Sequence, residues 1–358
     1  MHRVILTTDK EDADVFISIP FFTDEEAHAE LTASDWAKTI VIDDTDGFFA
    51  QHKTYRMARK AFADNYLAFF KRSFIKKTAS RAEVVRAGAF SPRTCVCDTV
   101  CVCRNYLLYK YASSKSTRSI PITPDTGAVD LPFGYWPYPR DFFPFSFAVE
   151  DQHLHALWDA DSLLAWDDGV GRDVPVFSSL RFHVKTFTGA RANVTRWLQE
   201  MDIEGAVVGS VDEGTRSKGG KHYWDYMRRA KIVATANPGG WEGDFRLWEA
   251  LASKALVFVD ELHAPIPCPL LHGEDVVYYD AYDRRSFKQK VRYYLAHPDE
   301  ARRIAMSGFH KAIRCHRWVN RVDYIMSTAA HLLDPGFKVR SESSACWCRF
   351  SSGPSTIS

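Results

Sequence analysis

The chain has 358 residues, of which 46% are hydrophobic and 25% are charged, which are the proportions of an ordinary globular protein. This length leaves room for two domains, each with a core of its own. The 46 basic and 45 acidic side chains give a formal net charge of +1, which excludes the strongly basic balance of a nucleic-acid or membrane-surface protein.

The N-terminal half, residues 1–175, is expected to form a Rossmann-like domain, the first of two. Apolar runs indicate two buried strands, and the polar segments that follow them indicate two helices. Asp44 and Asp46 come directly after the second strand, where α/β folds place ligand loops. A plain turn that caps a helix is the alternative for both residues. The expected strands are 13–20 and 39–43, and the expected helices are 24–30 and 54–72.

Residues 91–145 lack the periodicity of a helix or a strand and are expected to be irregular. Four cysteines lie there in C-x-C pairs only three residues apart, a spacing that suits one tetrahedral metal ion poorly. We therefore expect no metal site, and interpret 91–125 as an incidental segment or as doubtful coding sequence, with metal binding and redox chemistry of the cysteines as the alternatives. Prolines between 132 and 144 also argue against a helix or a central strand. The cysteines are Cys95, Cys97, Cys101 and Cys103.

The C-terminal half, residues 176–335, shows strands alternating with helices. This alternation predicts a parallel sheet with helices on both faces, and a Ser-rich tail at 336–358 is expected to be disordered. An amphipathic helix is expected at 190–201, with Val194, Trp197 and Leu198 on one face. The other expected strands are 174–180, 205–211, 231–238, 255–260 and 275–280, and the other expected helices are 223–230, 245–254, 287–296 and 298–315.

The segment 234–260 combines a strand, a Gly-rich turn and a helix that begins near residue 245. A helix N-terminus presents free N–H groups and a positive dipole end, and glycine lets a phosphate approach the backbone. Arg246 in the first turn suits a diphosphate. Glu249, three residues later on the same face, suits the two hydroxyls of a ribose. A structural ion pair between Arg246 and Glu242 or Asp244 is the alternative.

The pattern in this half extends from Tyr223 in one helix, through a Lys-Ile strand, to R-x-x-E-A-L at residues 246–251 and a strand that ends in Asp260. In this respect residues 222–335 resemble the C-terminal domain of exostosin-like and spore-maturation-type group 1 glycosyltransferases. The resemblance implies a GT-B fold, in which two Rossmann-like domains face a cleft. It also implies that the C-terminal domain binds a nucleotide-sugar donor, with Glu249 as the donor-site glutamate and Arg246 as the arginine on the phosphate side, and that the acceptor lies on the side of residues 1–175. Tyr223, Glu242, Gly243 and Asp244 are further candidates for donor binding by their place around the same turn and helix.

Two departures from the family pattern stand out. Group 1 enzymes often pair two glutamates with seven residues between them, whereas six separate Glu242 from Glu249, so the resemblance extends to Glu249 and not to Glu242. The glycine that usually ends the donor helix is Lys254 here, and a left-handed conformation at this residue would cost roughly 1 kcal/mol.

The implied reaction moves a hexosyl or pentosyl group from a nucleotide-sugar to a hydroxyl of a glycan or glycoconjugate, without a metal or other cofactor. Asp44, Asp46 and His155, with His153 beside it, are candidates for the base by residue type. One alternative is a protein that binds nucleotide-sugars without turnover. Another is a metal-dependent GT-A enzyme that uses Asp159 and Asp161. No G-x-G-x-x-G follows the first strand, so a dehydrogenase is disfavoured.

Neither a membrane-spanning segment nor a nucleic-acid partner is expected. The sequence has no run of 18 apolar residues, and the first 14 residues lack the apolar stretch of a signal peptide. These features favour a cytoplasmic protein. A gene product truncated at its N-terminus would leave the Golgi or ER lumen open.

Overall fold

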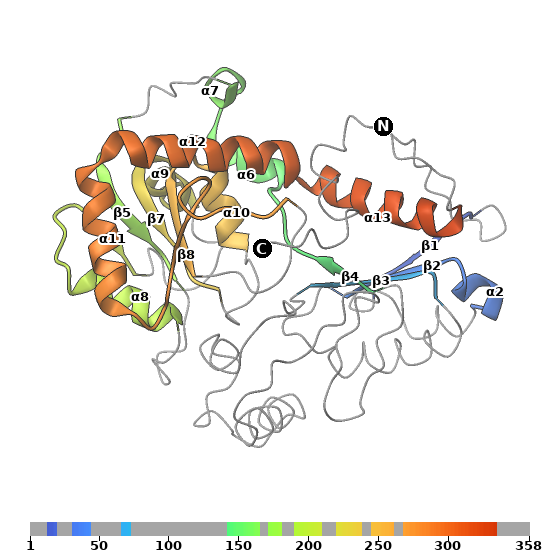
Figure 1. The fold of residues 1–358 in the computed structure, drawn as a ribbon. Helices are drawn as coiled ribbons and strands as arrows, with labels where there is room; N and C mark the ends of the chain where they lie inside the picture. Colours follow the sequence, from blue (N-terminus) through green and yellow to red (C-terminus); the bar gives the residue numbers. More distant parts are fainter. Residues whose placement is uncertain are drawn as a thin grey trace, which may run out of the picture.

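The computed structural model describes two parallel sheets and the helices around them (Figure 1). This confirms the expected fold class, which is α/β with two Rossmann-like units. The described residues are 13–19, 31–43, 66–72, 142–164, 171–180, 190–209, 220–237, 245–260 and 268–334. Asp44, Asp46, the cysteine run and the tail therefore lie outside them.

The first sheet has the strand order β1-β2-β3-β4, and all of its pairings are parallel. The short helix α2 (Ala33–Trp36) leads into β2, and the Thr32 hydroxyl caps it by accepting a hydrogen bond from the Asp35 N–H. Strand β2 is an interior strand because it pairs with β1 on one side and β3 on the other, and the side chain of Ile40 on it is fully buried. The strands are β1 (Phe16–Ser18), β2 (Thr39–Asp43), β3 (Ala68–Arg72) and β4 (Phe142–Phe145).

Two expectations about this half are wrong. The predicted helix at 54–72 is a strand over its described end, β3, because Ala68 and Phe70 alternate into the core while the backbone pairs with β2. The supposedly irregular segment 91–145 ends in a strand, β4. Proline fits there because β4 lies at the edge of the sheet, where Pro144 needs no ladder partner on its outer side.

The second sheet has the order β6-β5-β7-β8-β9 and is also entirely parallel. Its expected strands are confirmed as β5 (Val174–Ser178), β6 (Val207–Val208), β7 (Ala230–Ala234), β8 (Leu256–Asp260) and β9 (Val277–Tyr279). Its expected helices are confirmed as α8 (Ala190–Gln199), α9 (Gly220–Arg229), α10 (Phe245–Ala252), α11 (Arg284–Ala296) and α12 (Pro298–Cys315).

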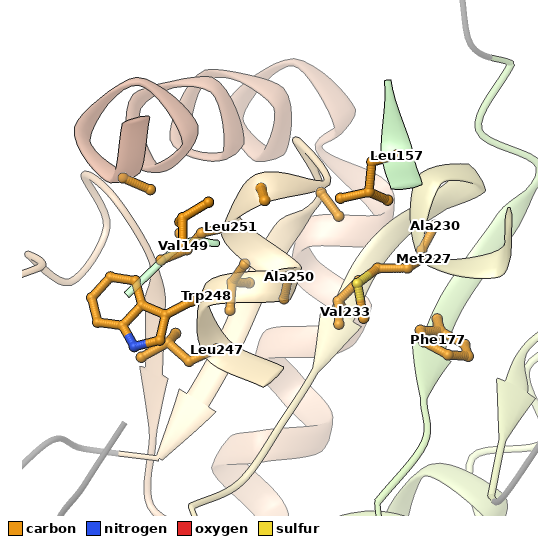
Figure 2. Packing of buried hydrophobic residues seen from close by; sticks show 14 of the residues in the cluster. Val149, Leu157, Phe177, Met227, Ala230, Val233, Leu247, Trp248, Ala250 and Leu251 are labelled. Carbon is orange, nitrogen blue, oxygen red and sulfur yellow. The ribbon is translucent and has the colours of Figure 1, made fainter. Parts of the chain in front are cut away.

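Apolar clusters cover both faces of the second sheet. One cluster joins Phe177 of β5 and Val233 of β7 to Met227 of α9 and to the helix α10. Figure 2 shows Trp248 and Leu251 of α10 beside Val149 in this cluster. The other cluster joins Phe258 of β8 to α8, α11 and α12, and contains the expected apolar face of α8. No helix in the described part of the chain is long and apolar enough to cross a membrane.

Three further helices connect the two sheets. Helices α6 (Asp151–Leu157) and α7 (Ala160–Leu164) follow β4, and Leu154 of α6 packs into the core of the second sheet. Helix α13 (Trp318–Leu333) follows α12 and returns to the first sheet, where Tyr324 lies edge-on against Phe70 (Figure 1). The domain boundary at 175/176 stays a prediction, and packing groups α6 with the second sheet and α13 with the first.

The chain thus passes between the two sheets twice, first in residues 146–150, between β4 and α6, and again in residues 315–317, between α12 and α13. These two segments, here called the crossings, are hydrogen-bonded to each other. Val149 forms an isolated parallel bridge with Arg317, and its N–H donates to the His316 carbonyl over 2.7 Å. The buried guanidinium of Arg321 donates to the carbonyls of Ser146 (3.3 Å) and Phe147 (3.2 Å) in one crossing, and to that of Cys315 (3.3 Å) in the other. Arg321 therefore fastens both crossings at one point.

Candidate functional site

The order of strands in the second sheet indicates where a ligand would bind. Strand β6 lies on one side of β5, whereas β7, β8 and β9 follow on the other side. The order therefore reverses between β5 and β7. In open α/β sheets, ligands bind outside the carboxyl ends of the strands at such a reversal. The residues after β7 lead to α10, so this helix begins at the predicted ligand edge.

Helix α10 is buried along its length, although it carries two charged residues. Every side chain from Arg246 to Ala252 is buried, with Arg246 only 7% and Glu249 only 2% exposed. A buried charge is costly unless other groups compensate for it. An arginine and a glutamate placed together inside a buried helix at a ligand edge are therefore a strong candidate for a binding site.

Glu249 is held by groups from two other helices. The Tyr223 hydroxyl of α9 donates a hydrogen bond to Glu249 Oε2 over 2.6 Å. His153 Nε2 of α6 lies 3.8 Å from Glu249 Oε1. Burial, together with the charge of Glu249, raises the pKa of Tyr223 above its ordinary value, so the hydroxyl keeps its proton and remains a donor. The two carboxylate oxygens thus face two different helices.

The hydrogen bonds of His153 determine which of its ring nitrogens faces Glu249. The Glu150 N–H donates to His153 Nδ1 over 3.4 Å, so Nδ1 acts as an acceptor and the proton of the neutral ring sits on Nε2. Nε2 also lies 3.6 Å from Glu150 Oε2. The imidazole packs beside Trp224, with ring centroids 5.5 Å apart. His153 therefore points its N–H end at two carboxylates.

Contacts at the C-terminal end of α10 explain how Lys254 can stand where related sequences usually have glycine. This residue has a φ of 57°, the left-handed conformation that the missing glycine would favour. Its side chain compensates, because Nζ donates to the Ser162 carbonyl over 2.6 Å and lies 4.4 Å from the centre of the Trp158 ring. The Trp158 N–H in turn donates to the Ala252 carbonyl over 2.8 Å. Lys254 thus joins the end of α10 to α7 and to the end of α6.

The remaining candidates differ in how far the structure describes them. His155 is exposed on α6, two residues from His153 and so on another side of the helix. Asp159 caps α7, because its carboxylate accepts a hydrogen bond from the Ser162 N–H over 2.7 Å, and this bond lowers the pKa of Asp159. The predicted site residues outside the described part are Asp44, Asp46, Glu242, Gly243 and Asp244.

Asp159 directly precedes the short helix α7, and Asp161 lies in its first turn. Across the described residues, no group of three or more His, Cys, Asp or Glu side chains is arranged to hold a metal ion. The roles predicted for Asp44, Asp46 and His155 stay predictions.

The contact between α6 and Glu249 was not foreseen from the sequence. One signal in residues 150–158 could have indicated α6. The spacing of Leu154, Leu157 and Trp158 is that of one helical face. The partner of His153 is Glu249, 96 residues further along the chain, and the helical and strand periods in a sequence do not indicate contacts between residues so far apart.

Comparison with known proteins agrees with the position of this site. Residues 184–327, about two fifths of the chain, match the family model described as glycosyl transferase-like. The matched segment contains Tyr223, Arg246 and Glu249. A comparison with curated proteins gives no match.

Several solved structures share a distant likeness over most of the chain. Sucrose-phosphate synthase from Thermosynechococcus elongatus is 12% identical, with 83% of this chain and 74% of that chain covered and a TM-score of 0.47. The Anabaena protein HepE in complex with UDP-glucose is 9% identical, with coverages of 85% and 81% and a TM-score of 0.45. An α,α-trehalose-phosphate synthase from Burkholderia vietnamiensis is 12% identical, with coverages of 87% and 79% and a TM-score of 0.44.

Proposed function

We propose that this protein is a GT-B glycosyltransferase, which moves a sugar from a nucleotide-sugar donor to a hydroxyl of a glycan or glycoconjugate. The observation that carries the proposal is the placement of Arg246 and Glu249 on a buried helix that begins at the strand-order reversal of a parallel sheet. The family match over residues 184–327 covers the same helix. Two parallel sheets joined by a double crossing suit the GT-B architecture.

In the proposed site, Arg246 and Glu249 recognise different parts of the donor. A guanidinium at the start of a helix is suited to a diphosphate, because it adds its charge to the dipole and the free N–H groups of the helix end. The Glu249 carboxylate has up to four lone-pair sites, so it has capacity for ribose hydroxyls while Tyr223 occupies Oε2. Tyr223 then acts through Glu249 by fixing its orientation.

The chemical step that needs assistance is departure of the nucleoside diphosphate. Negative charge grows on the leaving phosphate as the bond to the sugar breaks. Arg246 and the N-terminal end of α10 would stabilise that charge from a fixed position, and a preorganised site of this kind accelerates a reaction without a metal ion. The acceptor would approach from the side of the first sheet, and a base there would take its proton.

Thermal unfolding in the presence of UDP, GDP and ADP, and of the matching nucleotide-sugars, tests the donor site. A ligand at 100 times its dissociation constant adds about 2.7 kcal/mol of stability. We expect one nucleotide series to raise the unfolding temperature of the wild type, and the rise to disappear in Arg246→Ala and in Glu249→Gln. Arg285→Ala and Glu274→Gln alter exposed residues of the same two types and should keep the rise.

The outcomes separate the alternatives. A folded wild-type protein that responds to none of these ligands would rule out the donor site. Stabilisation without release of sugar or transfer to any acceptor would favour the non-catalytic binding protein. Transfer that stops on addition of EDTA and returns with a divalent cation would favour the metal-dependent alternative and direct attention to Asp159 and Asp161.

A further inference from the structure

The polar network around Glu249 extends beyond the residues that the proposed function uses. It runs from Tyr223 of α9, through Glu249 of α10, to His153 and Glu150 of α6. Gln152 donates to Glu150 Oε2 at its outer end. In a buried setting such a network is strong, because the low local dielectric strengthens each interaction. Three helices therefore contribute to the orientation of one carboxylate.

The role of His153 in this network is not accounted for by the proposed function. The side chain is 5% exposed, and it sits between two carboxylates and the Trp224 ring. A base for an acceptor hydroxyl must come within hydrogen-bond reach of that hydroxyl. A ring enclosed in this way does not meet that requirement, although residue type alone made His153 a candidate.

We propose that His153 is a positioning residue for Glu249, holding the Oε1 side of the carboxylate while Tyr223 holds the Oε2 side, so that the two oxygens meet the ribose hydroxyls of the donor in a fixed orientation. The Nε2–H end of the ring faces Oε1 at 3.8 Å, and its attraction is electrostatic at this distance, which exceeds that of a hydrogen bond. The Glu150 N–H fixes the ring by bonding Nδ1. This role rests on the proposed function, because it assigns Glu249 to the ribose.

The preference for ribose over deoxyribose measures this role directly. A hydrogen bond from a ribose hydroxyl to a carboxylate contributes about 10-fold to 100-fold in affinity. We therefore expect the wild-type protein to bind one of UDP, GDP and ADP at least about tenfold more tightly than the 2′-deoxy form of the same nucleotide. Calorimetric titration of both forms gives the two dissociation constants.

Two substitutions at residue 153 separate positioning from simple structural support. His153→Phe keeps a ring beside Trp224 but removes the N–H, and should reduce the preference for ribose to less than about threefold, with affinity for the deoxy form changed by less than about twofold. His153→Gln can place an amide N–H near the position of Nε2 and should restore the preference. His297→Phe, at an exposed histidine that stacks on Tyr293, is the control and should leave both affinities unchanged.

A second measurement needs no ligand. If His153 and Glu249 interact, the unfolding temperature of the double variant His153→Phe/Glu249→Gln should fall by less than the sum of the two single falls. Additive falls would overturn the contact and, with it, the positioning role.

The results distinguish the two proposals. Equal losses of affinity for the ribo and deoxy forms in His153→Phe would overturn the positioning role and leave the donor site standing. A wild-type protein that binds none of the nucleotides would overturn the proposed function and the nucleotide role of His153 together. In that case, non-additive unfolding temperatures would identify the network as structural only.

Discussion

The indole ring of Trp248 lies against the imidazole ring of His316, with ring centroids 4.7 Å apart and planes inclined by 32°. The Arg321 guanidinium carbon lies 5.6 Å from the centre of the same indole. Trp248 is the neighbour of Glu249 in sequence, so α10 packs against the double crossing with one residue and enters the polar network with the next. The candidate donor helix and the crossing between the sheets are parts of one packed unit.

Tyr223→Phe should weaken the protein and its donor site together. The change removes the donor to Glu249 Oε2 and leaves a buried carboxylate with one hydrogen bond fewer. We expect a loss of about 1–3 kcal/mol in the free energy of unfolding, measured by urea denaturation. Tyr226→Phe, on the same helix at a partly buried ring that stacks on Phe177, is the control. Equal effects of the two changes would contradict the assigned hydrogen bond.

Arg321→Met should be one of the most destabilising changes in the described part of the chain. It keeps much of the side-chain volume but deprives three carbonyls and His316 Nδ1 of their donor. We expect a loss of at least about 3 kcal/mol in urea denaturation, since buried groups left without a partner cost about 1–3 kcal/mol each. Arg317→Met removes a partly exposed arginine four residues away, and should cost less than about 1 kcal/mol. Similar losses would show that Arg321 does not fasten the crossings.

His316 should make stability fall as the pH decreases. Burial first, and then the charge of Arg321, lower the pKa of His316 well below 6.5. The unfolded chain therefore binds a proton near pH 6.5, whereas the folded protein stays neutral at this residue until a much lower pH, so stability is lost as pH falls below about 6.5. The contribution is at most about 1.4 kcal/mol per pH unit.

The variant His316→Gln isolates this effect. Glutamine keeps an amide donor for the Cys268 carbonyl but does not titrate. We expect the wild type to lose more stability than the variant between pH 7 and pH 5 in parallel urea titrations. An equal loss in both proteins would remove His316 as the source.

Substitutions at Lys254 should reverse the usual order of alanine and glycine. The left-handed backbone favours glycine by roughly 1 kcal/mol, so Lys254→Gly should be more stable than Lys254→Ala. Both should be less stable than the wild type, because both lose the bond to the Ser162 carbonyl and the contact with Trp158. Gln289, an exposed residue inside α11, gives the opposite order as a control, with alanine more stable than glycine by about 1 kcal/mol.

Much of the second sheet could be predicted from the sequence, because each of its strands and helices has a recognisable pattern in a short stretch of residues. Buried parallel strands appear as short apolar runs such as residues 255–260, and the helix α8 shows its buried face in the spacing of Val194, Trp197 and Leu198. The first sheet was harder to predict. The aromatic residues of β3 are compatible with a buried helix or a strand, and only pairing with β2 decides between them.

The candidate site was predictable only in part. The spacing of Arg246 and Glu249 on one helix could be seen in the sequence, as could the unusual residue at 254. The burial of both charges, the bond from Tyr223 and the approach of His153 arise from the packing of three helices. These contacts join residues 26 and 96 positions apart, and no helical or strand period spans such separations.

The return of α13 to the first sheet has a consequence for synthesis on the ribosome. The core around Ile40 and Phe70 is completed by Tyr324, Ile325 and Ala329. About 260 residues separate the end of β3 at Arg72 from the end of α13 at Leu333. At about 5–20 residues per second, the ribosome needs roughly 13–50 seconds to cover that distance. All strands of the second sheet are made within this interval and before α13, so the core of the sheet that is made first is completed last, and we expect its apolar strands to stay uncovered for longer than those of the second sheet.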